Sequence, residues 1–364
     1  MEKTNEKKKI IITGGGTLGH ILPILPVVFS IYNEYDLYFI GTIKGKEKSY
    51  FKKNNIIRYF KKIYYVDMIG INRKKIYKNF VTIIKYIKSS YEIKKILGKI
   101  KPDLVIGMGG YISGVVIKQA IKKDIKTIIH EQNAIMGFAN KLVYKKVNKV
   151  LLTYEIKDLN IKNKCLIGNP RLNYVKKTYK TSDKNIILIF GGSLGSVFLN
   201  NLIINNIDYF NIQFYNIYLV VGDKYYVDNQ SKIKKIEKDY TFIKIYNFLD
   251  NIIDIMKDSS LIICRSGAST ISEILGLRKP TIFIPSPNVT SNHQYYNALD
   301  LYNKGCCEMI EEKNLTKEKL YDLIKQILTT YSYKQGIITN INKYYNNNPL
   351  NDFINVIKEE IWKN

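Results

Sequence analysis

Short apolar runs alternate along most of the chain with longer segments in which apolar residues recur at helical spacing. Runs that are apolar throughout predict strands buried on both faces of a parallel sheet, with helices between them. In the first half we expect strands at Lys9–Thr13, Leu37–Gly41, Leu104–Gly107, Thr127–His130 and Lys149–Thr153. In the second half we expect them at Ile186–Phe190, Tyr218–Gly222, Phe242–Tyr246, Leu261–Cys264, Thr281–Ile284 and Glu308–Ile310. The alternation predicts an α/β class in which a doubly wound fold occurs twice.

Three of these strands break into a glycine-rich turn that opens a helix, within Lys8–His20, Pro102–Gly114 and Asn185–Ser196. A helix N-terminus presents unpaired backbone N–H groups and the positive end of a dipole, and glycine lets a ligand approach that backbone closely. Each turn is therefore a candidate anion site. Three of them in two halves of one chain predict a cleft between two nucleotide-binding-like domains.

The length of 364 residues predicts two domains. The polar segment 167–184 contains Pro170 and is the best linker candidate, with a hinge near Gly168–Arg171. We therefore expect an N-terminal domain at 1–168 and a C-terminal domain at 169–350. The segment 351–364 has apolar residues at helical spacing and is expected to pack back onto the first domain; they are Phe353, Val356, Ile357, Ile361 and Trp362.

Charge is the most unusual feature of the composition, with 57 Lys and Arg against 31 Asp and Glu, a net charge of +26. Part of this excess follows from heavy use of Lys, Ile, Asn and Tyr throughout the chain. The other explanation is an anionic partner, such as a membrane surface, nucleic acid or a phosphorylated substrate. The basic residues are dispersed and no nucleic-acid-binding motif accompanies them, so we expect no nucleic-acid partner.

The four cysteines show no CxxC spacing and two of them are adjacent, which fits neither a zinc site nor a disulfide framework. This usage predicts a reduced, cytosolic protein. The first apolar run is interrupted by Gly14, Gly15, Gly16 and Pro23, and is too short to span a bilayer. We expect no membrane-spanning segment.

The first glycine turn also satisfies GxGxxG through Gly14, Gly16 and Gly19, which is typical of NAD-dependent enzymes. That fingerprint requires an acidic residue at the end of the second strand, where it binds ribose hydroxyls. Here the second strand ends in Gly41 and Thr42 instead. An NAD-dependent oxidoreductase therefore remains only a lesser alternative.

A second candidate nucleoside site follows the strand that ends at Cys264–Arg265. Ser266–Gly267–Ala268 is expected to form a tight turn, and Ser269 or Thr270 to cap a helix that carries Glu273 in its first turn. Glu273 then has two interpretations: it complements the helix dipole, or it accepts both vicinal hydroxyls of a ribose. Gln294, further along the chain, could hydrogen-bond a sugar in the same place.

Seven motifs occur in order: GGGTLGHILP, GMGGYISG, HEQNAIMGFANK, GNPR, GGSLGS, CRSGASTISE and HQYYNA. Together they make the chain resemble the MurG enzymes of glycosyltransferase family 28, from about Ile10 to Ala298. The resemblance implies a GT-B fold of two Rossmann-like domains. It also implies transfer of N-acetylglucosamine from UDP-N-acetylglucosamine to undecaprenyl-pyrophosphoryl-MurNAc-pentapeptide (lipid I), giving lipid II. In one departure Leu18 stands where the family commonly has glycine.

The resemblance also implies the binding residues. For the donor UDP-N-acetylglucosamine they are Thr17, Leu18, Gly19 and Asn133 near the sugar; Arg171 and Ser193 near the diphosphate; Leu249 at the uracil; Ala268, Ser269, Thr270, Ile271, Ser272 and Glu273 at the nucleoside, with Glu273 on the ribose; and Gln294 at the sugar. For the diphosphate of the acceptor they are Gly15, Gly16, Gly109, Gly110 and Tyr111.

Family members convert an α-linked donor into a β-1,4 product, so the acceptor hydroxyl attacks from the face opposite UDP. Such an attack needs a base, and His20 is our candidate because its ordinary pKa, about 6.5, lets it accept a proton at neutral pH. Its alternatives are to orient the loop or to bind acceptor phosphate. Glu131 is the other catalytic candidate, or it fixes the turn before Asn133. His130 and His293 we expect to be structural.

No metal and no other cofactor is expected, because the chain has no Asp-x-Asp motif of the kind with which the other major glycosyltransferase fold holds a cation. Helix dipoles and Arg171 would take the place of the metal at the diphosphate.

The lipid acceptor implies a peripheral enzyme on the cytoplasmic face of the bacterial cell membrane, meeting cell-wall synthesis and division proteins. The candidate membrane patch lies in 69–97 and includes Arg73, Lys74, Lys75, Lys78, Phe80 and Ile84. The alternative is a core helix with a solvated basic face. A related GT-B enzyme that glycosylates another lipid, such as diacylglycerol, is the alternative for the whole chain.

Overall fold

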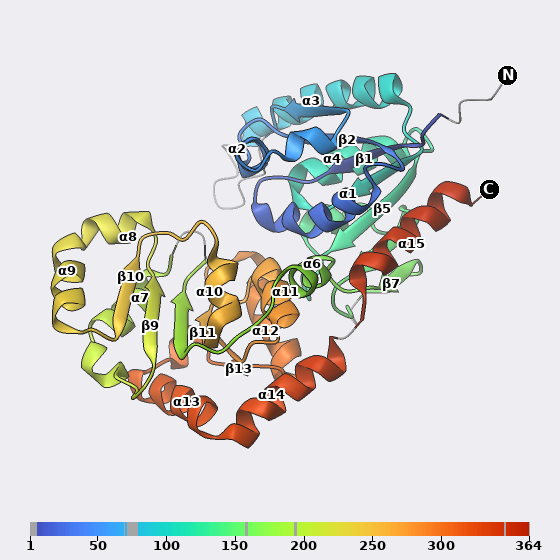
Figure 1. Ribbon diagram of the computed structural model, residues 1–364. Coiled ribbons are helices and arrows are strands. Elements are labelled where there is room, and N and C mark those ends of the chain that lie inside the picture. The colour runs from blue at the N-terminus through green and yellow to red at the C-terminus, as the bar shows by residue number, and fades with distance from the viewer. Residues whose placement is uncertain are drawn as a thin grey trace. The chain divides into compact units, whose positions relative to one another are not determined.

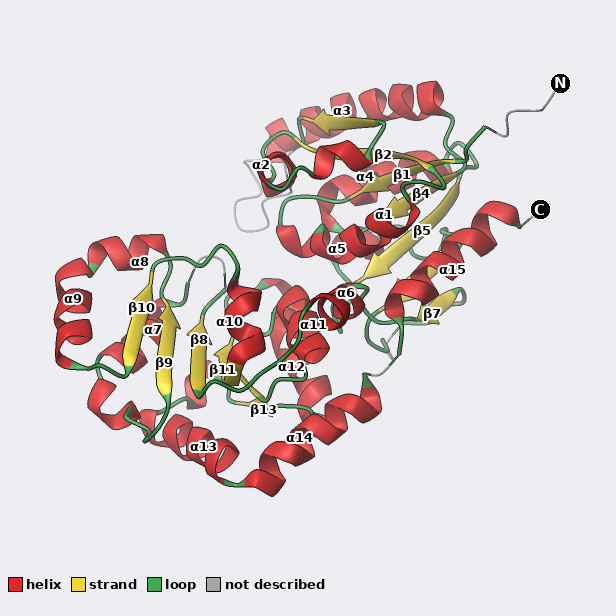
Figure 2. Ribbon diagram, in the orientation of Figure 1, coloured by secondary structure: helices red, strands yellow, loops and turns green. Residues whose placement is uncertain are grey.

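A computed structural model describes residues 6–68, 70, 79–156, 159–192, 195–345 and 347–363 of the chain. These residues form two compact units (Figure 1). The first comprises residues 1–171 and 348–364, and the second residues 172–347. Each unit is a parallel β-sheet covered by helices (Figure 2), so the α/β class predicted from the apolar runs is confirmed.

All strand pairs in the first unit are parallel, and the sheet order is β3-β2-β1-β4-β5-β6-β7. The order reverses between β1 and β4, and a reversal of this kind is where doubly wound sheets bind ligands. The strands are β1 (Lys9–Thr13), β2 (Asp36–Thr42), β3 (Lys62–Val66), β4 (Leu104–Gly107), β5 (Lys126–Glu131), β6 (Lys149–Leu152) and β7 (Lys164–Leu166).

Helices cover both faces of this first sheet, because successive side chains of a buried strand point to opposite faces. Ile10 and Ile12 of β1 pack in one core and Ile11 packs in another. The helices are α1 (Leu25–Ile31), α2 (Lys46–Lys53), α3 (Asn79–Ile100), α4 (Gly110–Ile121), α5 (Phe138–Lys141) and α15 (Pro349–Trp362), with 3-10 turns η1 (Leu18–His20), η2 (Leu22–Ile24) and η3 (Ile56–Tyr59).

The C-terminal helix α15 belongs to the first unit although it is last in the sequence. Phe353 and Ile357 are fully buried in the same core as Ile10 and Ile12. Burial of an aromatic and an aliphatic side chain contributes about 1.5–3 kcal/mol each, which is enough to hold the helix on this unit.

The second unit repeats the same topology with the order β10-β9-β8-β11-β12-β13, and the reversal lies between β8 and β11. Its strands are β8 (Ile186–Phe190), β9 (Asn216–Val220), β10 (Ile243–Tyr246), β11 (Ser259–Cys264), β12 (Thr281–Phe283) and β13 (Glu308–Met309). Its helices are α6 (Arg171–Thr178, whose first residue belongs to the first unit), α7 (Val197–Ile204), α8 (Asp223–Asp228), α9 (Gln230–Asp239), α10 (Ile252–Asp258), α11 (Ala268–Leu277), α12 (His293–Asn303), α13 (Lys317–Thr329) and α14 (Tyr331–Tyr344), with 3-10 turns η5 (Ile207–Phe210), η6 (Thr290–Asn292) and η7 (Glu312–Asn314).

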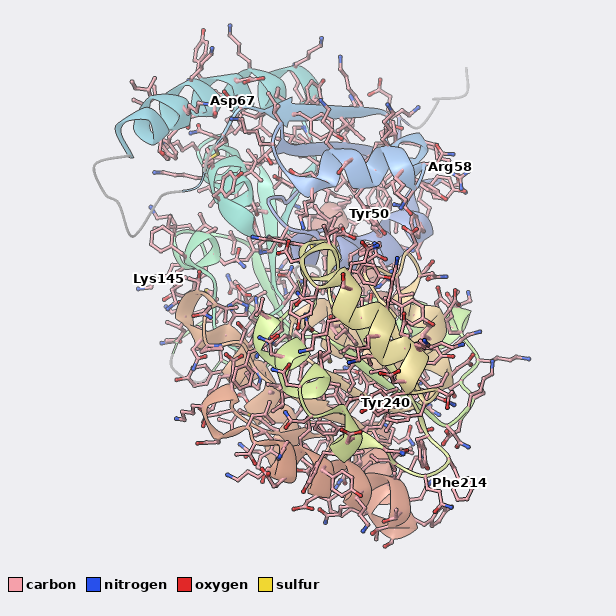
Figure 3. The ribbon with its side chains drawn as sticks, turned by 90° about the vertical axis from the view of Figure 1, so that its left-hand side faces the viewer. Tyr50, Arg58, Asp67, Lys145, Phe214 and Tyr240 are labelled. Carbon is pink, nitrogen blue, oxygen red and sulfur yellow. The ribbon has the colours of Figure 1, made fainter. Side chains whose placement is uncertain are left out.

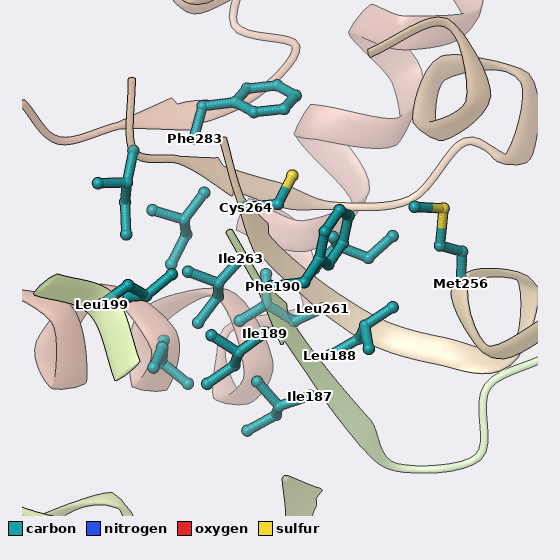
Figure 4. Packing of buried hydrophobic residues seen from close by; sticks show 14 of the residues in the cluster. Ile187, Leu188, Ile189, Phe190, Leu199, Met256, Leu261, Ile263, Cys264 and Phe283 are labelled. Carbon is teal, nitrogen blue, oxygen red and sulfur yellow. The ribbon is translucent and has the colours of Figure 1, made fainter. Parts of the chain in front are cut away.

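The centre of the second unit is the pair of strands on either side of its reversal. Figure 4 shows Ile187, Leu188, Ile189 and Phe190 of β8 beside Leu261 and Ile263 of β11. Most of these residues are fully buried, which explains why β8 is apolar throughout and why β11 has the apolar run Leu261–Cys264. The rigid core ends where the two glycine-bearing turns after β8 and β11 begin.

Two strands were missing from the sequence prediction, β3 and β7, and both lie at an edge of the first sheet. Their residues are mostly exposed or half-buried, so neither forms a continuous apolar run. The strand expected at Tyr218–Gly222 begins two residues earlier, at Asn216. The segment 167–184, expected as a linker, contains α6.

The first glycine turn does not open an α-helix directly, as we expected, but leads through two 3-10 turns before α1 begins at Leu25. Pro23 and Pro26 are the physical reason. Proline lacks a backbone N–H and is compatible only with the first turn of an α-helix. The regular helix therefore begins at Leu25, with Pro26 in its first turn.

Candidate active site

The first and second glycine turns lie against one another where the first sheet reverses. Gly109 and Gly110 have φ of +96° and +80°, a conformation that favours glycine. A Cβ atom at Gly110 would overlap the carbonyl oxygen of Gly15, and one at Gly109 would lie 2.9 Å from Cδ2 of His20. Gly109 and Gly110 therefore both have to be glycine, because the His20 ring and the first turn occupy the space that their side chains would fill.

The ring of His20 is held by the backbone of its own turn. Its Nδ1 atom lies 3.1 Å from the Gly15 carbonyl oxygen and 3.4 Å from the Thr17 hydroxyl. A carbonyl oxygen only accepts hydrogen bonds, so Nδ1 carries the hydrogen. In the neutral ring the lone pair is then on Nε2, as a general base requires.

Glu47 was not among the residues singled out from the sequence, yet it belongs to this site. Its side chain is fully buried and accepts three hydrogen bonds: from the Thr42 N–H at 2.7 Å, the Thr42 hydroxyl at 2.7 Å and the Gly16 N–H at 3.2 Å. Gly16 is one of the residues expected at the acceptor diphosphate, and in this structure its N–H donates to the Glu47 carboxylate.

The first turn also lies beside Tyr111, expected at the acceptor diphosphate, and contains Thr17, Leu18 and Gly19, expected near the donor sugar. Tyr111, the second residue of α4, is half-buried, and its ring lies 3.5 Å from where a Cβ of Gly16 would be. Thr17 is exposed, while Leu18 and Gly19 are half-buried in η1. The backbone of the first turn therefore carries a half-buried leucine where the family commonly has glycine.

Glu131 ends β5 and organises the turn that follows. One carboxylate oxygen accepts from the Asn133 N–H and side-chain amide, each at 3.1 Å. The other accepts from the Gly137 N–H at 2.8 Å and the Asn140 amide at 2.9 Å. The side chain is 3% exposed. With both oxygens occupied by four donors, the geometry favours the turn-fixing role of Glu131 over the catalytic one.

His130 is fully buried, and its Nε2 lies 3.1 Å from the Gly168 carbonyl oxygen. Burial lowers the pKa of the imidazole to about 4, although the Gly168 hydrogen bond opposes this shift. Its Nδ1 has no hydrogen-bond partner among the described residues. His130 is therefore a neutral structural histidine. His293 donates through Nδ1 to the Thr290 carbonyl oxygen of its own turn, at 2.8 Å.

The third glycine turn follows β8 in the second unit, and the expected donor ligand Ser193 lies outside the described residues. The hydroxyl of Ser196 caps α7, accepting from the Leu199 N–H at 3.4 Å. It also accepts from the Arg265 guanidinium at 2.7 Å. Arg265 therefore connects the turn after β11 to the turn after β8, across the sheet reversal.

Arg265 holds further parts of the same edge. Its guanidinium donates to the carbonyl oxygens of Ile284 and Pro285 at 3.0 and 3.1 Å, and it pairs with Glu312. The side chain of Arg265 is 10% exposed. From the sequence, Arg265 was expected only as the end of a strand, although an arginine directly after a buried strand is an indication of such a role.

Helix α11 begins at Ala268 with Gly267 as its N-cap, and neither Ser269 nor Thr270 caps it. Because the helix starts directly after the turn, both residues lie within its first turn and cannot reach back to the cap position. The expected position of Glu273 is also wrong: it is the sixth residue of the helix and is 6% exposed.

The remaining nucleoside-site residues of α11 differ in exposure, and Ala268, Ser269 and Thr270 at its start are half-buried. Ile271 and Ser272 are buried, and the Ser272 hydroxyl donates to the Ala268 carbonyl oxygen at 2.8 Å. Glu273 lies close to Cys264, and burial together with the Glu273 charge raises the pKa of that thiol.

Gln294, at the start of α12, is tied to the turn after β11. Its side-chain oxygen accepts from the Ser286 N–H at 2.9 Å, and its backbone oxygen accepts from the Ser266 hydroxyl at 2.7 Å. Leu249, in the loop after β10, is half-buried against the core. These residues all follow strands of one parallel sheet and therefore lie at its carboxyl edge.

Arg171 and Asn133 belong to the first unit. Arg171 is 9% exposed, and its N–H donates to the Asn169 side chain at 3.0 Å. Asn133 is half-buried in the turn that Glu131 fixes. The nucleoside-site residues from Leu249 onward belong to the second unit.

The predicted membrane patch lies largely outside the described residues, which exclude Arg73, Lys74, Lys75, Lys78 and the side chain of Phe80. Of its described part, Ile84 is 53% exposed on α3, and Ile87 and Tyr91 follow it at helical spacing with 63% and 62% exposure. Asp67, labelled beside α3 in Figure 3, pairs with Lys85 at 2.6 Å. This exposed stripe is not part of a core.

Among the described residues, no group of three or more histidine, cysteine, aspartate or glutamate side chains is placed to hold a metal ion. Within the same residues, no helix combines the length and the apolar character needed to cross a bilayer.

Comparison with known proteins matches both halves of the chain to one family. The glycosyltransferase family 28 N-terminal domain matches residues 10–152, and the C-terminal domain of the same family matches residues 186–348.

Two curated relatives carry the name UDP-N-acetylglucosamine–N-acetylmuramyl-(pentapeptide) pyrophosphoryl-undecaprenol N-acetylglucosamine transferase. The protein of Lactobacillus johnsonii is 33% identical over 344 residues, covering 89% of this chain and 91% of its own. That of Bacillus subtilis strain 168 is 34% identical over 335 residues, covering 88% and 90%.

Solved structures share the fold. The crystal structure of Acinetobacter baumannii MurG superposes with a TM-score of 0.76 at 24% identity, covering 97% of this chain and 99% of that one. A UDP-N-acetylglucosamine 2-epimerase superposes with a TM-score of 0.70 at 14% identity, covering 97% and 96%. The GT-B architecture expected from the motifs is thereby confirmed.

Proposed function

The chain belongs to glycosyltransferase family 28, and on that premise we propose that it transfers N-acetylglucosamine from UDP-N-acetylglucosamine to lipid I to form lipid II. The observation that carries this function is the match to the named transferases over about nine-tenths of both chains, including both halves of the GT-B fold. Membership also removes the NAD-dependent alternative. An acidic residue, Glu47, does follow β2, where an NAD site would use a carboxylate to bind the ribose. Its oxygens instead accept hydrogen bonds from the N–H groups of Thr42 and Gly16, which agrees with that exclusion.

The acceptor binds to the first unit in this proposal, at the reversal between β1 and β4. Two observations support this placement. The glycine turns after β1 and β4 contact each other there, and the His20 ring lies between them. The N-terminus of α4, a helix of 12 residues, supplies unpaired N–H groups for the acceptor diphosphate in place of the occupied Gly16 N–H.

The donor binds to the second unit, at the reversal between β8 and β11. The start of α7 and the start of α11 flank this point, and Arg265 connects the two turns. Helix N-termini favour negative charge, so they suit the diphosphate and the uracil carbonyls of UDP. Glu273 binds the ribose and Gln294 the sugar as the resemblance implies, although Gln294 uses its side-chain oxygen for Ser286.

In the reaction, Nε2 of His20 takes the proton of the acceptor hydroxyl as its oxygen attacks the anomeric carbon of the donor sugar. The new C–O bond forms on one face while the bond to the diphosphate breaks on the other. UDP leaves with the electron pair, which inverts the configuration. Helix N-termini and Arg171 stabilise the negative charge on the leaving diphosphate.

The lipid acceptor requires contact with an anionic membrane surface, on the cytoplasmic face. Two groups of exposed residues support this contact. On α3 the exposed stripe Ile84, Ile87 and Tyr91 has lysines beside it, Lys88, Lys94 and Lys95. At α5 the side chains of Phe138 and Leu142 are exposed. Leu142 lines a surface hollow of about 400 Å³ together with the basic residues Lys141, Lys145 and Lys146; Figure 3 labels Lys145.

Vesicle sedimentation tests the membrane contact. Lys94→Glu with Lys95→Glu is expected to reduce binding to vesicles of anionic lipid, since each basic residue near such a surface contributes about 1 kcal/mol. The matched control is Lys234→Glu with Lys235→Glu on α9, in the second unit. Equal loss in both double variants would show that only the overall charge matters.

Acceptor-dependent UDP release tests the function itself. With UDP-N-acetylglucosamine, release is expected to depend on a lipid I analogue and to be absent with diacylglycerol. Release that requires diacylglycerol instead would establish the alternative lipid acceptor.

A further inference from the structure

Glu47 and His20 hydrogen-bond to the two ends of a single peptide group. The Glu47 carboxylate accepts from the Gly16 N–H at 3.2 Å, and Nδ1 of His20 donates to the Gly15 carbonyl oxygen at 3.1 Å. This N–H and this C=O belong to the same planar unit, the peptide bond between Gly15 and Gly16. A carboxylate is therefore linked to the imidazole through one backbone peptide.

From this geometry we propose that Glu47 is a positioning residue for His20, acting through the Gly15–Gly16 peptide. The inference rests on the proposed role of His20 as the base. The carboxylate fixes the plane of the peptide so that its C=O faces Nδ1, which keeps the hydrogen on Nδ1 and the lone pair on Nε2. This is what a carboxylate does for histidine when it binds the ring directly.

The link is also electrostatic. A peptide whose N–H donates to a carboxylate has a more negative carbonyl oxygen, because hydrogen bonds in a chain polarise one another. The Gly15 carbonyl is then a stronger acceptor for Nδ1–H. When Nε2 takes the acceptor proton, the positive charge of the ring is stabilised through the peptide, without a carboxylate in contact with the substrate.

The surroundings of Glu47 are built for a carboxylate. Its three partners are all donors, two N–H groups and one hydroxyl, and the side chain is fully buried. A Cβ at Gly15 would lie 2.6 Å from Oε1, one at Gly41 would lie 3.2 Å from it, and one at Gly45 would overlap Oε2. Three glycines thus leave the space that the carboxylate occupies.

Tyr65 of β3 is the second titratable group near this carboxylate. Burial raises the pKa of the Tyr65 hydroxyl, and the charge of Glu47 raises it further, so the phenol stays neutral at neutral pH. Tyr65 is therefore not a competing source of charge beside the peptide.

Two variants separate the link from simple loss of structure. Glu47→Gln keeps the shape of the side chain, but an amide has only one oxygen and cannot accept from both Thr42 and Gly16. Its NH₂ group would face the N–H of one of these two residues. Gly45→Ala keeps the carboxylate, and its φ of −79° suits alanine, but the new methyl group displaces Oε2 from Gly16. Glu92→Gln, at an exposed position of α3, is the matched control.

The direct readout is the tautomer of His20 in long-range ¹H–¹⁵N spectra of histidine-labelled protein without substrate. The chain has only 3 histidines, so each ring can be assigned from one His→Gln variant. In the wild-type protein His20 is expected to carry its hydrogen on Nδ1. In Glu47→Gln and in Gly45→Ala it is expected to become a mixture of tautomers, while His130 and His293 do not change.

Kinetics give the second readout. Both variants are expected to lower kcat for transfer about tenfold or more, within the range that a general base contributes, and to leave the KM for UDP-N-acetylglucosamine unchanged. If Glu47→Gln does not fold, Gly45→Ala alone decides. An unchanged His20 tautomer and unchanged kcat in a folded variant overturn the proposal. If the wild-type protein has no transfer activity, the proposed function fails while the tautomer experiment still tests the link.

Discussion

Arg265 and Ser196 are joined by a hydrogen bond of 2.7 Å between the guanidinium and the serine hydroxyl, which connects the turn after β11 to the N-cap of α7. The two turns flank the sheet reversal at which the donor diphosphate is expected to bind. The bond fixes the start of α7 relative to the start of α11, so the N–H groups of both helices are in place before a ligand arrives.

Arg265→Met is therefore expected to weaken UDP binding about tenfold. It is also expected to lower the free energy of unfolding by about 2 kcal/mol, because it leaves the half-buried Glu312 carboxylate without this partner. Isothermal titration with UDP and urea unfolding measure the two effects. Arg58→Met, at an exposed position of the first unit, is the control and should change neither. UDP affinity at the wild-type level in a folded Arg265→Met protein would refute the positioning role.

Glu131→Gln distinguishes the two roles considered for Glu131. An amide cannot accept four hydrogen bonds from N–H groups, so the variant is expected to lose about 2 kcal/mol of unfolding free energy or more. Urea unfolding checks this loss, with the exposed Glu155→Gln as control. A large loss of kcat with unchanged stability would instead support Glu131 as the catalytic base.

His130 makes the stability of the first unit depend on pH. Its pKa is about 4 in the folded protein against about 6.5 when unfolded, so the unfolded state binds a proton first as the pH falls. The contribution is fully present above pH 6.5 and declines toward pH 4, by about 2 kcal/mol at pH 5. Urea unfolding at pH 7.5 and pH 5 should show this decline, and it should be smaller in His130→Gln. His293→Gln should keep the wild-type dependence.

The thiols are expected to react unequally with a thiol reagent at neutral pH. Burial raises the pKa of Cys264 and Cys307, and raises that of Cys306 to about 11, so these three carry almost no thiolate. Cys165 is half-buried. With a reagent that releases a chromophore when it reacts with a thiol, the native protein should therefore release one equivalent of chromophore rapidly. Cys165→Ser should abolish this rapid release. Rapid reaction of a second thiol in the variant would contradict the burial of the other three.

Local sequence predicted the strands beside both sheet reversals and the three glycine turns. Those features depend on neighbouring residues: β1 contains three consecutive isoleucines, β8 is apolar throughout, and each strand is followed at once by glycine. The edge strands β3 and β7 escaped prediction because exposure at an edge allows polar residues.

The role of Glu47 could not be predicted in the same way. It stands in the lysine-rich segment KGKEKSYFKK, which resembles an exposed helix. Its partners, Gly16 and Thr42, are brought to it only by folding. The nearby Gly41 and Gly45 were the only local indication that its side chain needs unusual space. Similarly, the start of α11 depended on where β11 ends, which placed Glu273 inside the helix rather than in its first turn.

Mass spectrometry of the lipid product tests the central claim most directly. The wild-type protein is incubated with a lipid I analogue, UDP-N-acetylglucosamine and UDP-glucose together, in the presence of EDTA. We predict that the analogue gains a single N-acetylhexosamine, that no hexose is added, and that the chelator has no effect. Addition of hexose, loss of transfer in the presence of the chelator, or no addition despite UDP release would contradict the account.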